Sequence, residues 1–123
     1  MSYKPEGYPD LSPYLVVRDA EYTLRFCTEV LEGETKRIHR RENGNIEHGE
    51  VKIGDSLVMF GQKGEGIESL LHLYVAHPEK VFQAALAFGA REIQPVEEQG
   101  DGDRRGAVKD ANGISWYFAS AQS

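Results

Sequence analysis

The sequence predicts an α+β fold made of two copies of one strand–helix–strand–strand–strand unit. Three observations support this prediction. A hairpin pattern at residues 102–118 has a shorter echo, with the same order of parts, at residues 50–60. Each hairpin is preceded by an apolar strand and by a helical pattern, which ends at Gly33 in the first half and at Gly89 in the second. A self-similar period of about sixty residues indicates a duplicated unit.

The C-terminal hairpin is the clearest element. Residues 114–118 are a β-branched and aromatic run that includes the only tryptophan, and such a run favours a strand. Asp110 and Gly113 suit the preceding tight turn, because aspartate bonds to nearby backbone groups and glycine accepts a positive φ. Aligning Val51 with Val108 superposes the two hairpins, with one extra residue in the second turn.

The first half begins with an apolar strand at residues 14–17, which we expect to be buried on both faces. Asp19 is placed to cap the following helix, because its carboxylate can accept from the first free backbone N–H groups. The apolar stripe of this helix comprises Ala20, Leu24, Cys27 and Leu31, with Val30 at its edge. Cys27 on this stripe is interpreted as a core residue.

A strand with long basic side chains is expected next, at residues 35–41. Asn43-Gly44 then predicts the turn of a hairpin. Along the following strand, the alternation of side chains places His48 and Glu50 on the same face.

The second half repeats this order. An apolar strand at residues 70–75 leads to a helix with Pro78 at its first position, where proline is favoured. Gly89 is placed to end that helix in the left-handed conformation. A short strand at residues 93–96 and an acidic loop at residues 97–101 precede the C-terminal hairpin.

Charge and cysteine content exclude several classes of protein. The chain has 123 residues, a net charge of −6 and a pI near 5.2, which argues against nucleic acid because its phosphates require a basic face. No apolar run approaches the ~20 residues of a membrane span, and no signal peptide is visible. Cys27 is the only cysteine, so no intramolecular disulfide can form. We therefore expect a cytoplasmic protein with neither nucleic acid nor membrane as a partner.

The strand end Val17-Arg18-Asp19-Ala20, the strand His48-Gly49-Glu50 and the hairpin from Gly102 to Trp116 resemble the vicinal oxygen chelate superfamily. That superfamily includes glyoxalase I, the bleomycin resistance proteins and extradiol dioxygenases, and the resemblance is greatest to its PhnB-like branch. It implies one domain over residues 1–123, with module 1 at about residues 10–62 and module 2 at about residues 69–120. The two βαβββ modules are expected to form a curved, cup-like mixed sheet with the helices outside.

Enzymes of this superfamily bind a divalent metal through four His, Glu or Gln side chains on four cup strands. The resemblance places these positions at or near Ser12, Val58, Leu70 and Tyr117. None of them is a good ligand for Zn²⁺ or Fe²⁺, which need imidazole, carboxylate or thiolate donors. We therefore expect the usual metal centre to be missing. The alternative is a non-standard site for Zn, Ni, Fe or Mn, formed by His48, Glu50 and His72.

The period of two along the strands, counted from the family's positions, predicts which side chains line the cup. The ligand-binding candidates are Tyr14, His48, Glu50, His72, Tyr74, Arg105 and Tyr117. Trp116 and Phe118 then face the helices. A buried tyrosine hydroxyl needs a partner, which a ligand can supply. Arg105 suits a carboxylate or phosphate, or an ion pair with Asp103 or Glu50.

Three functions remain open, and whether the protein is an enzyme stays undecided. The first, which we expect, is a small-molecule binding protein of the glyoxalase/bleomycin resistance type, a homodimer without a cofactor. The second is a metal-dependent lyase, isomerase or dioxygenase that uses the non-standard His/Glu site. The third is a metal-free enzyme with a tyrosine or Glu50 as general acid or base. In addition, Tyr3 and Tyr8 are expected to dock on a neighbouring molecule.

Overall fold

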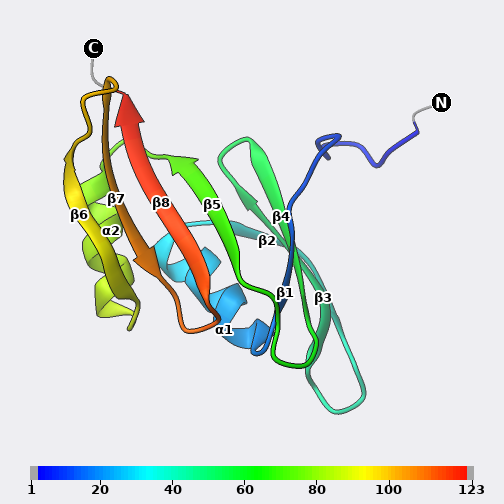
Figure 1. Cartoon of the computed structure of the whole chain (residues 1–123). Helices are drawn as coiled ribbons and strands as arrows, with labels where there is room; N and C mark the ends of the chain where they lie inside the picture. The colour runs from blue at the N-terminus through cyan, green and yellow to red at the C-terminus, as the bar shows by residue number, and fades with distance from the viewer. Residues whose placement is uncertain (1–2, 122–123) are drawn as a thin grey trace. The chain divides into compact units, whose positions relative to one another are not determined.

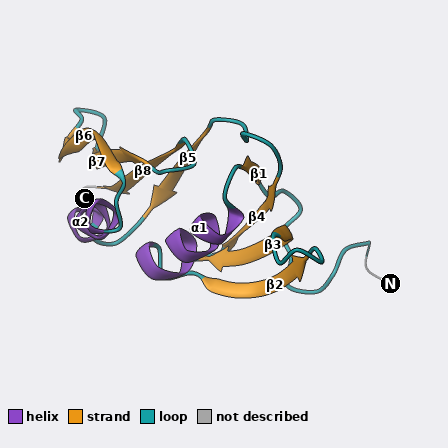
Figure 2. Ribbon diagram, turned by 90° about the horizontal axis from the view of Figure 1, so that it is seen from below, coloured by secondary structure: helices purple, strands orange, loops and turns teal. Residues whose placement is uncertain are grey.

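The computed structural model describes residues 3–121, which form two compact units that divide between Gly66 and Ile67. Each unit is a four-stranded mixed sheet with a helix packed on one face, as Figures 1 and 2 show. None of the helices in the described residues is long and apolar enough to cross a membrane.

Both units have the same order of elements and the same strand order. The first contains β1 (Tyr14–Val17), α1 (Ala20–Arg25), the π-helix η1 (Phe26–Val30), β2 (Glu34–Arg40), β3 (Ile46–Ile53) and β4 (Ser56–Gln62). The second contains β5 (Ser69–Tyr74), α2 (Pro78–Ala87), β6 (Arg91–Glu98), β7 (Asp103–Lys109) and β8 (Ile114–Ala121). The sheets run β1-β4-β3-β2 and β5-β8-β7-β6, and in each the first strand is parallel to its neighbour. The predicted duplication of a βαβββ unit is confirmed.

The register of the two hairpins also agrees with the sequence alignment. Val51 pairs with Val58 in the first unit, and Val108 pairs with Trp116 in the second. The second turn has one residue more than the first. Two residues separate the end of β3 from the start of β4, whereas three residues separate Asp110 from Ile114, to whose carbonyl its N–H donates.

The turn of the second hairpin is built around the buried carboxylate of Asp110. Its Oδ1 accepts the backbone N–H groups of Asn112 and Ile114, at 2.8 and 3.0 Å. Its Oδ2 accepts the indole N–H of Trp116 at 2.8 Å. Gly113 has a φ of 81°, as the predicted turn requires. One side chain therefore holds both the turn and the largest core residue.

The first helix confirms one prediction and corrects another. Asp19 caps it, since Asp19 Oδ1 accepts the N–H of Tyr22 at 3.2 Å. The predicted stripe is wrong at Leu24 and Leu31, which are only half-buried. The π-helix, with its wider turn, changes which side chains face the sheet, and it buries Phe26 together with Val30, which was expected at the edge of the stripe.

Gly33 does not end this helix in the left-handed conformation. Glu32 takes that conformation, with a φ of 56°. Gly33 has a different role, because a Cβ there would lie 2.5 Å from Cγ1 of Val51. In the second unit Gly89 has a φ of 103°, as predicted for a helix end.

The expectation that residues 14–17 are buried on both faces is wrong. Leu15 and Val17 are buried, whereas Tyr14 is exposed and Val16 half-buried. The reason is the position of β1 at the edge of a sheet that carries its helix on one face only. The strand expected at 93–96 is also longer, so that Glu97 and Glu98 belong to β6 and not to a loop.

The core of each unit lies between its sheet and its helix. In the first unit Leu15, Val17, Phe26, Val51 and Phe60 are fully buried. In the second unit Ala85, Val108, Trp116 and Phe118 have the same role, as predicted for the last two. The opposite faces of the two sheets, which carry no helix, are called the open faces below.

Candidate functional site

Three of the predicted site residues come together on the open face of the first unit. Glu50 and Tyr14 both pair with Met59, so that their side chains stand in one row across β3, β4 and β1. His48 follows on β3, two residues from Glu50 and therefore on the same face. The sequence prediction that His48 and Glu50 share a face is confirmed.

These side chains form a continuous hydrogen-bonded row. Nε2 of His48 lies 2.6 Å from Oε2 of Glu50, and Nδ1 of the same ring lies 3.3 Å from the hydroxyl oxygen of Tyr14. The other carboxylate oxygen of Glu50 accepts the hydroxyl of Tyr8. The result is a tyrosine, an imidazole and a carboxylate in order, which we call the Tyr14–His48–Glu50 row.

Glu50 is ionised at neutral pH although it is only 4% exposed. Burial pushes the pKa of Glu50 up, but the hydrogen bonds from Tyr8 and His48 outweigh it and leave the pKa below its ordinary value. The hydrogen bond to Glu50 in turn raises the pKa of Tyr8. With an ionised Glu50 as acceptor, Nε2 of a neutral His48 carries the proton and Nδ1 accepts from Tyr14.

The N-terminal segment, residues 3–13, explains why Glu50 is buried. Tyr8 brings this segment onto β3, and Leu57 on the same open face is buried as well. Tyr3 donates to Asp10 at 2.6 Å, within the segment itself. Both hydroxyls are bonded within the chain, and the docking of Tyr3 and Tyr8 on a neighbouring molecule stays a prediction.

The open face of the second unit holds a different cluster. Nε of Arg105 donates to Nε2 of His72 at 3.2 Å, and Nη2 of Arg105 lies 3.1 Å from Asp101 and 3.0 Å from Asp103. Tyr74 donates its hydroxyl to Asp103 at 2.8 Å, which raises the pKa of Tyr74. The ion pair of Arg105 with Asp103, one of the predicted alternatives, is confirmed. Tyr117 pairs with His72 across β5 and β8.

The repeat gives these two clusters an exact residue correspondence. Tyr14 pairs with Met59 as His72 pairs with Tyr117, so Tyr14 and His72 are equivalent positions. Since Val51 corresponds to Val108, His48 corresponds to Arg105 and Glu50 to Ala107. The same fold is thus built with alanine where the first unit places a buried carboxylate. Forming the sheet does not require the row.

The residues at the family's metal positions do not fit a metal. Val58 itself is buried on the helix-facing side with Val51, and its neighbour Met59 is the residue that lies on the open face. Neither Met59, Leu70 nor Tyr117 offers the donors that Zn²⁺ or Fe²⁺ needs. Within residues 3–121 no three His, Cys, Asp or Glu side chains come together as a metal-binding group.

The alternative donors are engaged with other partners. His48 Nε2 and Glu50 Oε2 are bonded to each other, and Nε2 of His72 accepts from Arg105. The non-standard site stays a prediction that the arrangement does not favour. The residues that sequence reasoning missed are Tyr8, Asp101 and the role of Asp103 toward Tyr74. The sequence indicated Tyr8 only as a docking residue, because no local pattern links it to Glu50, which lies 42 positions away.

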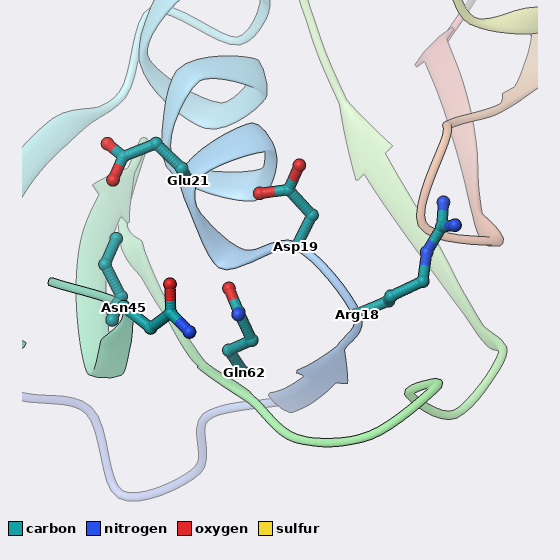
Figure 3. A pocket seen from close by; sticks show the side chains of 6 residues that line it. Arg18, Asp19, Glu21, Asn45 and Gln62 are labelled. Atoms are coloured by element: carbon teal, nitrogen blue, oxygen red, sulfur yellow. The ribbon is translucent and has the colours of Figure 1, made fainter. Parts of the chain in front are cut away.

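A separate hollow of about 470 Å³ lies at the start of α1 (Figure 3). It is lined by Arg18, Asp19, Glu21, Asn45, Ile46 and Gln62. Its polar groups already have structural roles, since Gln62 accepts the N–H of Ala20 at 3.0 Å and Glu21 pairs with Arg40 at 2.8 Å. Figure 3 shows the Arg18 side chain pointing away from Asn45 and Gln62. We do not assign a ligand to it.

Solved structures with high structural similarity show the fold that this chain shares. TioX from Micromonospora sp. ML1 superposes with a TM-score of 0.78 and 20% identity, over 92% of this chain and 98% of TioX. The fosfomycin resistance protein FosX from Mesorhizobium loti gives 0.69 and 15%, over 97% and 95% of the two chains. A member of the glyoxalase/bleomycin resistance protein/dioxygenase superfamily from Sphaerobacter thermophilus gives 0.70 and 17%, over 89% and 94%. The chain has the fold of that superfamily, as the sequence resemblance implied.

Sequence relatives are found among mycobacterial proteins, and no family model matches the chain. The uncharacterized protein Mb0911c of Mycobacterium bovis is 31% identical to this chain, and the matched region covers 88% of this chain and 80% of the relative. Rv0887c of Mycobacterium tuberculosis, also uncharacterized, is 31% identical over 88% of this chain and 72% of its own length. The chain belongs to the family of these mycobacterial proteins.

Proposed function

We propose that the protein binds a small molecule on the open face of its first unit, without the usual metal centre. The observation that carries this proposal is the Tyr14–His48–Glu50 row. Burying an ionised carboxylate costs several kcal/mol unless charge or hydrogen bonds compensate. The second unit avoids this cost with Ala107 at the same position. A buried carboxylate that needs hydrogen bonds from both Tyr8 and His48, at a position where the fold also forms with alanine, is most simply explained by a ligand.

The surroundings of the row suit an organic ligand. Tyr14 is 49% exposed, and Met59 lies between Tyr14 and Glu50 in the row of paired residues. Ring and thioether surfaces provide apolar contact, while the half-exposed imidazole and the phenol provide polar groups that fix orientation. A small molecule with one apolar part and one hydrogen-bonding group fits this description.

The fold neighbours support a small molecule as the class of ligand. One is named a fosfomycin resistance protein, and another, from Clostridium phytofermentans, a glyoxalase-related enzyme. The PhnB-like branch, the homodimer and the cytoplasmic location expected from the sequence belong to the same proposal. Size-exclusion chromatography with light scattering checks the homodimer.

A thermal-shift screen tests the proposal. The panel holds small aromatic and carbonyl compounds together with Mg²⁺, Mn²⁺, Fe²⁺, Ni²⁺ and Zn²⁺, each added alone. A ligand at 100 times its Kd stabilises the native state by about 2.7 kcal/mol, or about 10 °C for a chain of this size. We expect such a shift from one organic class and none from the metals. The shift should be lost in His48→Ala and retained in the control His77→Ala, because His77 lies at the start of α2 in the second unit.

The opposite pattern would contradict the proposal. A stoichiometric metal that raises the melting temperature, and that is lost in both His48→Ala and His72→Ala, would establish the metal-dependent alternative. Equal organic shifts in wild type and His48→Ala would move the ligand away from this face.

A further inference from the structure

The Tyr14–His48–Glu50 row has the composition and order of a catalytic proton relay. A hydroxyl faces one ring nitrogen at 3.3 Å, and the other ring nitrogen is fixed by a buried carboxylate at 2.6 Å. A nucleophile or base oriented by a second group, itself oriented by a third, is the general arrangement of activated hydroxyls in enzymes. We propose that this row catalyses proton transfer from a bound small molecule, with Tyr14 as the catalytic residue. The inference goes beyond binding and rests on the site proposed above.

The step consists of two coupled proton transfers, whose net effect is to move one proton from the substrate to His48, and it involves no oxidation or reduction. His48 Nδ1 takes the hydroxyl proton of Tyr14 while the phenol oxygen takes a proton from the substrate. The substrate keeps the electron pair as an oxyanion or enolate, and Glu50 stabilises the imidazolium. The proton returns along the same path when product forms. The substrate class is therefore a small molecule with a weakly acidic proton, on a hydroxyl or on a carbon next to a carbonyl.

The backbone beneath Tyr14 is shaped for this hydroxyl. A Cβ at Gly61 would lie 2.8 Å from the Tyr14 hydroxyl oxygen and 2.5 Å from the carbonyl oxygen of Glu47. Glycine at this point of β4 lets the phenol cross the strand and reach His48. In the second unit, the equivalent contact joins His72 and Arg105 at 3.2 Å, with no hydroxyl in it. The relay is therefore specific to one copy of the repeat.

Other tyrosines of the chain provide an internal comparison. Tyr3, Tyr8 and Tyr74 each donate to a carboxylate, which raises the pKa of the hydroxyl and makes the phenolate harder to form. Tyr3 and Tyr74 are also more exposed than Tyr14, at 84% and 62% against 49%. Exposure alone therefore predicts that Tyr14 is less reactive than these two, whereas the relay predicts the reverse.

Labelling with 4-(2-aminoethyl)benzenesulfonyl fluoride separates these predictions. The phenol oxygen forms a bond to sulfur, the sulfur–fluorine bond breaks, fluoride leaves, and the phenol proton passes to His48 and then to water. Peptide mapping by mass spectrometry gives the rate at every tyrosine of the full chain. General-base assistance is typically worth 10²–10⁴, and we expect at least about tenfold faster labelling of Tyr14 than of Tyr74. His48→Gln should slow the labelling of Tyr14 about tenfold, Glu50→Gln should slow it less, and His77→Gln, at the start of α2 in the second unit, should leave the Tyr14 rate unchanged.

Either of two results would overturn the relay. One is that Tyr14 is labelled no faster than Tyr74, and the other is that the labelling rate of Tyr14 is unchanged in His48→Gln. Far-ultraviolet circular dichroism verifies that each variant is folded, and ¹⁵N NMR of His48 in wild type gives a reading that needs no variant. The Nε2–H tautomer is expected, and the Nδ1–H tautomer would refute the proposal. Tyr14→Phe, which keeps the ring but lacks the hydroxyl, should abolish proton transfer and should reduce the thermal shifts with organic ligands without abolishing them. Selective labelling without any thermal shift would refute the binding proposal alone.

Discussion

Replacing Asp110 by alanine tests how the second hairpin is held together. The substitution removes three hydrogen bonds, two to backbone N–H groups and one to the indole of Trp116. Trp116 is 2% exposed, so its N–H loses a charged acceptor inside the core. Hydrogen bonds to charged acceptors contribute roughly 1.5–3 kcal/mol each, and an unsatisfied buried donor costs about 1–3 kcal/mol.

The cost of burying the charge of Asp110 offsets part of the stabilisation that its hydrogen bonds provide. Burial raises the pKa of Asp110 above its ordinary value, against the hydrogen bonds from Trp116 and the turn, which lower it. The ionised group is therefore held at a cost that alanine removes. We expect a net loss of about 3 kcal/mol in the free energy of unfolding for Asp110→Ala, equal to about 12 °C in Tm. Asp110→Asn keeps the shape and the turn but cannot accept from the indole with its NH₂ group, and it should lose about 1–2 kcal/mol.

Urea unfolding followed by the fluorescence of the single tryptophan reports directly on this region. With an m-value of about 2 kcal/mol/M, the midpoint for Asp110→Ala should fall by about 1.5 M. Asp55→Ala in the corresponding turn of the first unit is the matched control, because Asp55 is exposed and accepts only from Ser56. It should change stability by less than about 0.5 kcal/mol. An equally small effect at Asp110 would refute the reasoning.

Two further predictions concern the first unit. The lowered pKa of Glu50 means that its contribution to stability is present above the ordinary value of 4.5 and is lost as pH falls through the folded-state pKa. The stability gap between wild type and Glu50→Gln, measured by urea unfolding from pH 7 to pH 3, should therefore narrow on acidification, and a gap that widens would contradict this sign. Glu32→Gly should raise stability by about 0.5–1 kcal/mol, because it relieves a left-handed non-glycine residue. Gly89→Ala at the corresponding helix end should lower stability by about 1–2 kcal/mol. A Glu32→Gly variant that is less stable than wild type, or a Gly89→Ala variant that is more stable, would contradict this reasoning.

The sequence alone determined the architecture. The turn residues Asp110 and Gly113, the alternation along strands and the echo of Val108 at Val51 are short-range signals. Each is imposed by local backbone geometry, so each can be identified without knowing what lies opposite. The same alternation placed His48 and Glu50 on one face, which is half of the candidate site.

Only the tertiary structure decided which groups complete that site. Tyr8 reaches Glu50 from 42 positions away, and Tyr14 reaches His48 across a strand that has glycine at the crossing. The π-helix and the left-handed Glu32 were invisible for a related reason, since packing against the sheet overrides the propensity of these residues. Contacts between distant segments depend on how the whole chain closes, and no local pattern encodes that closure.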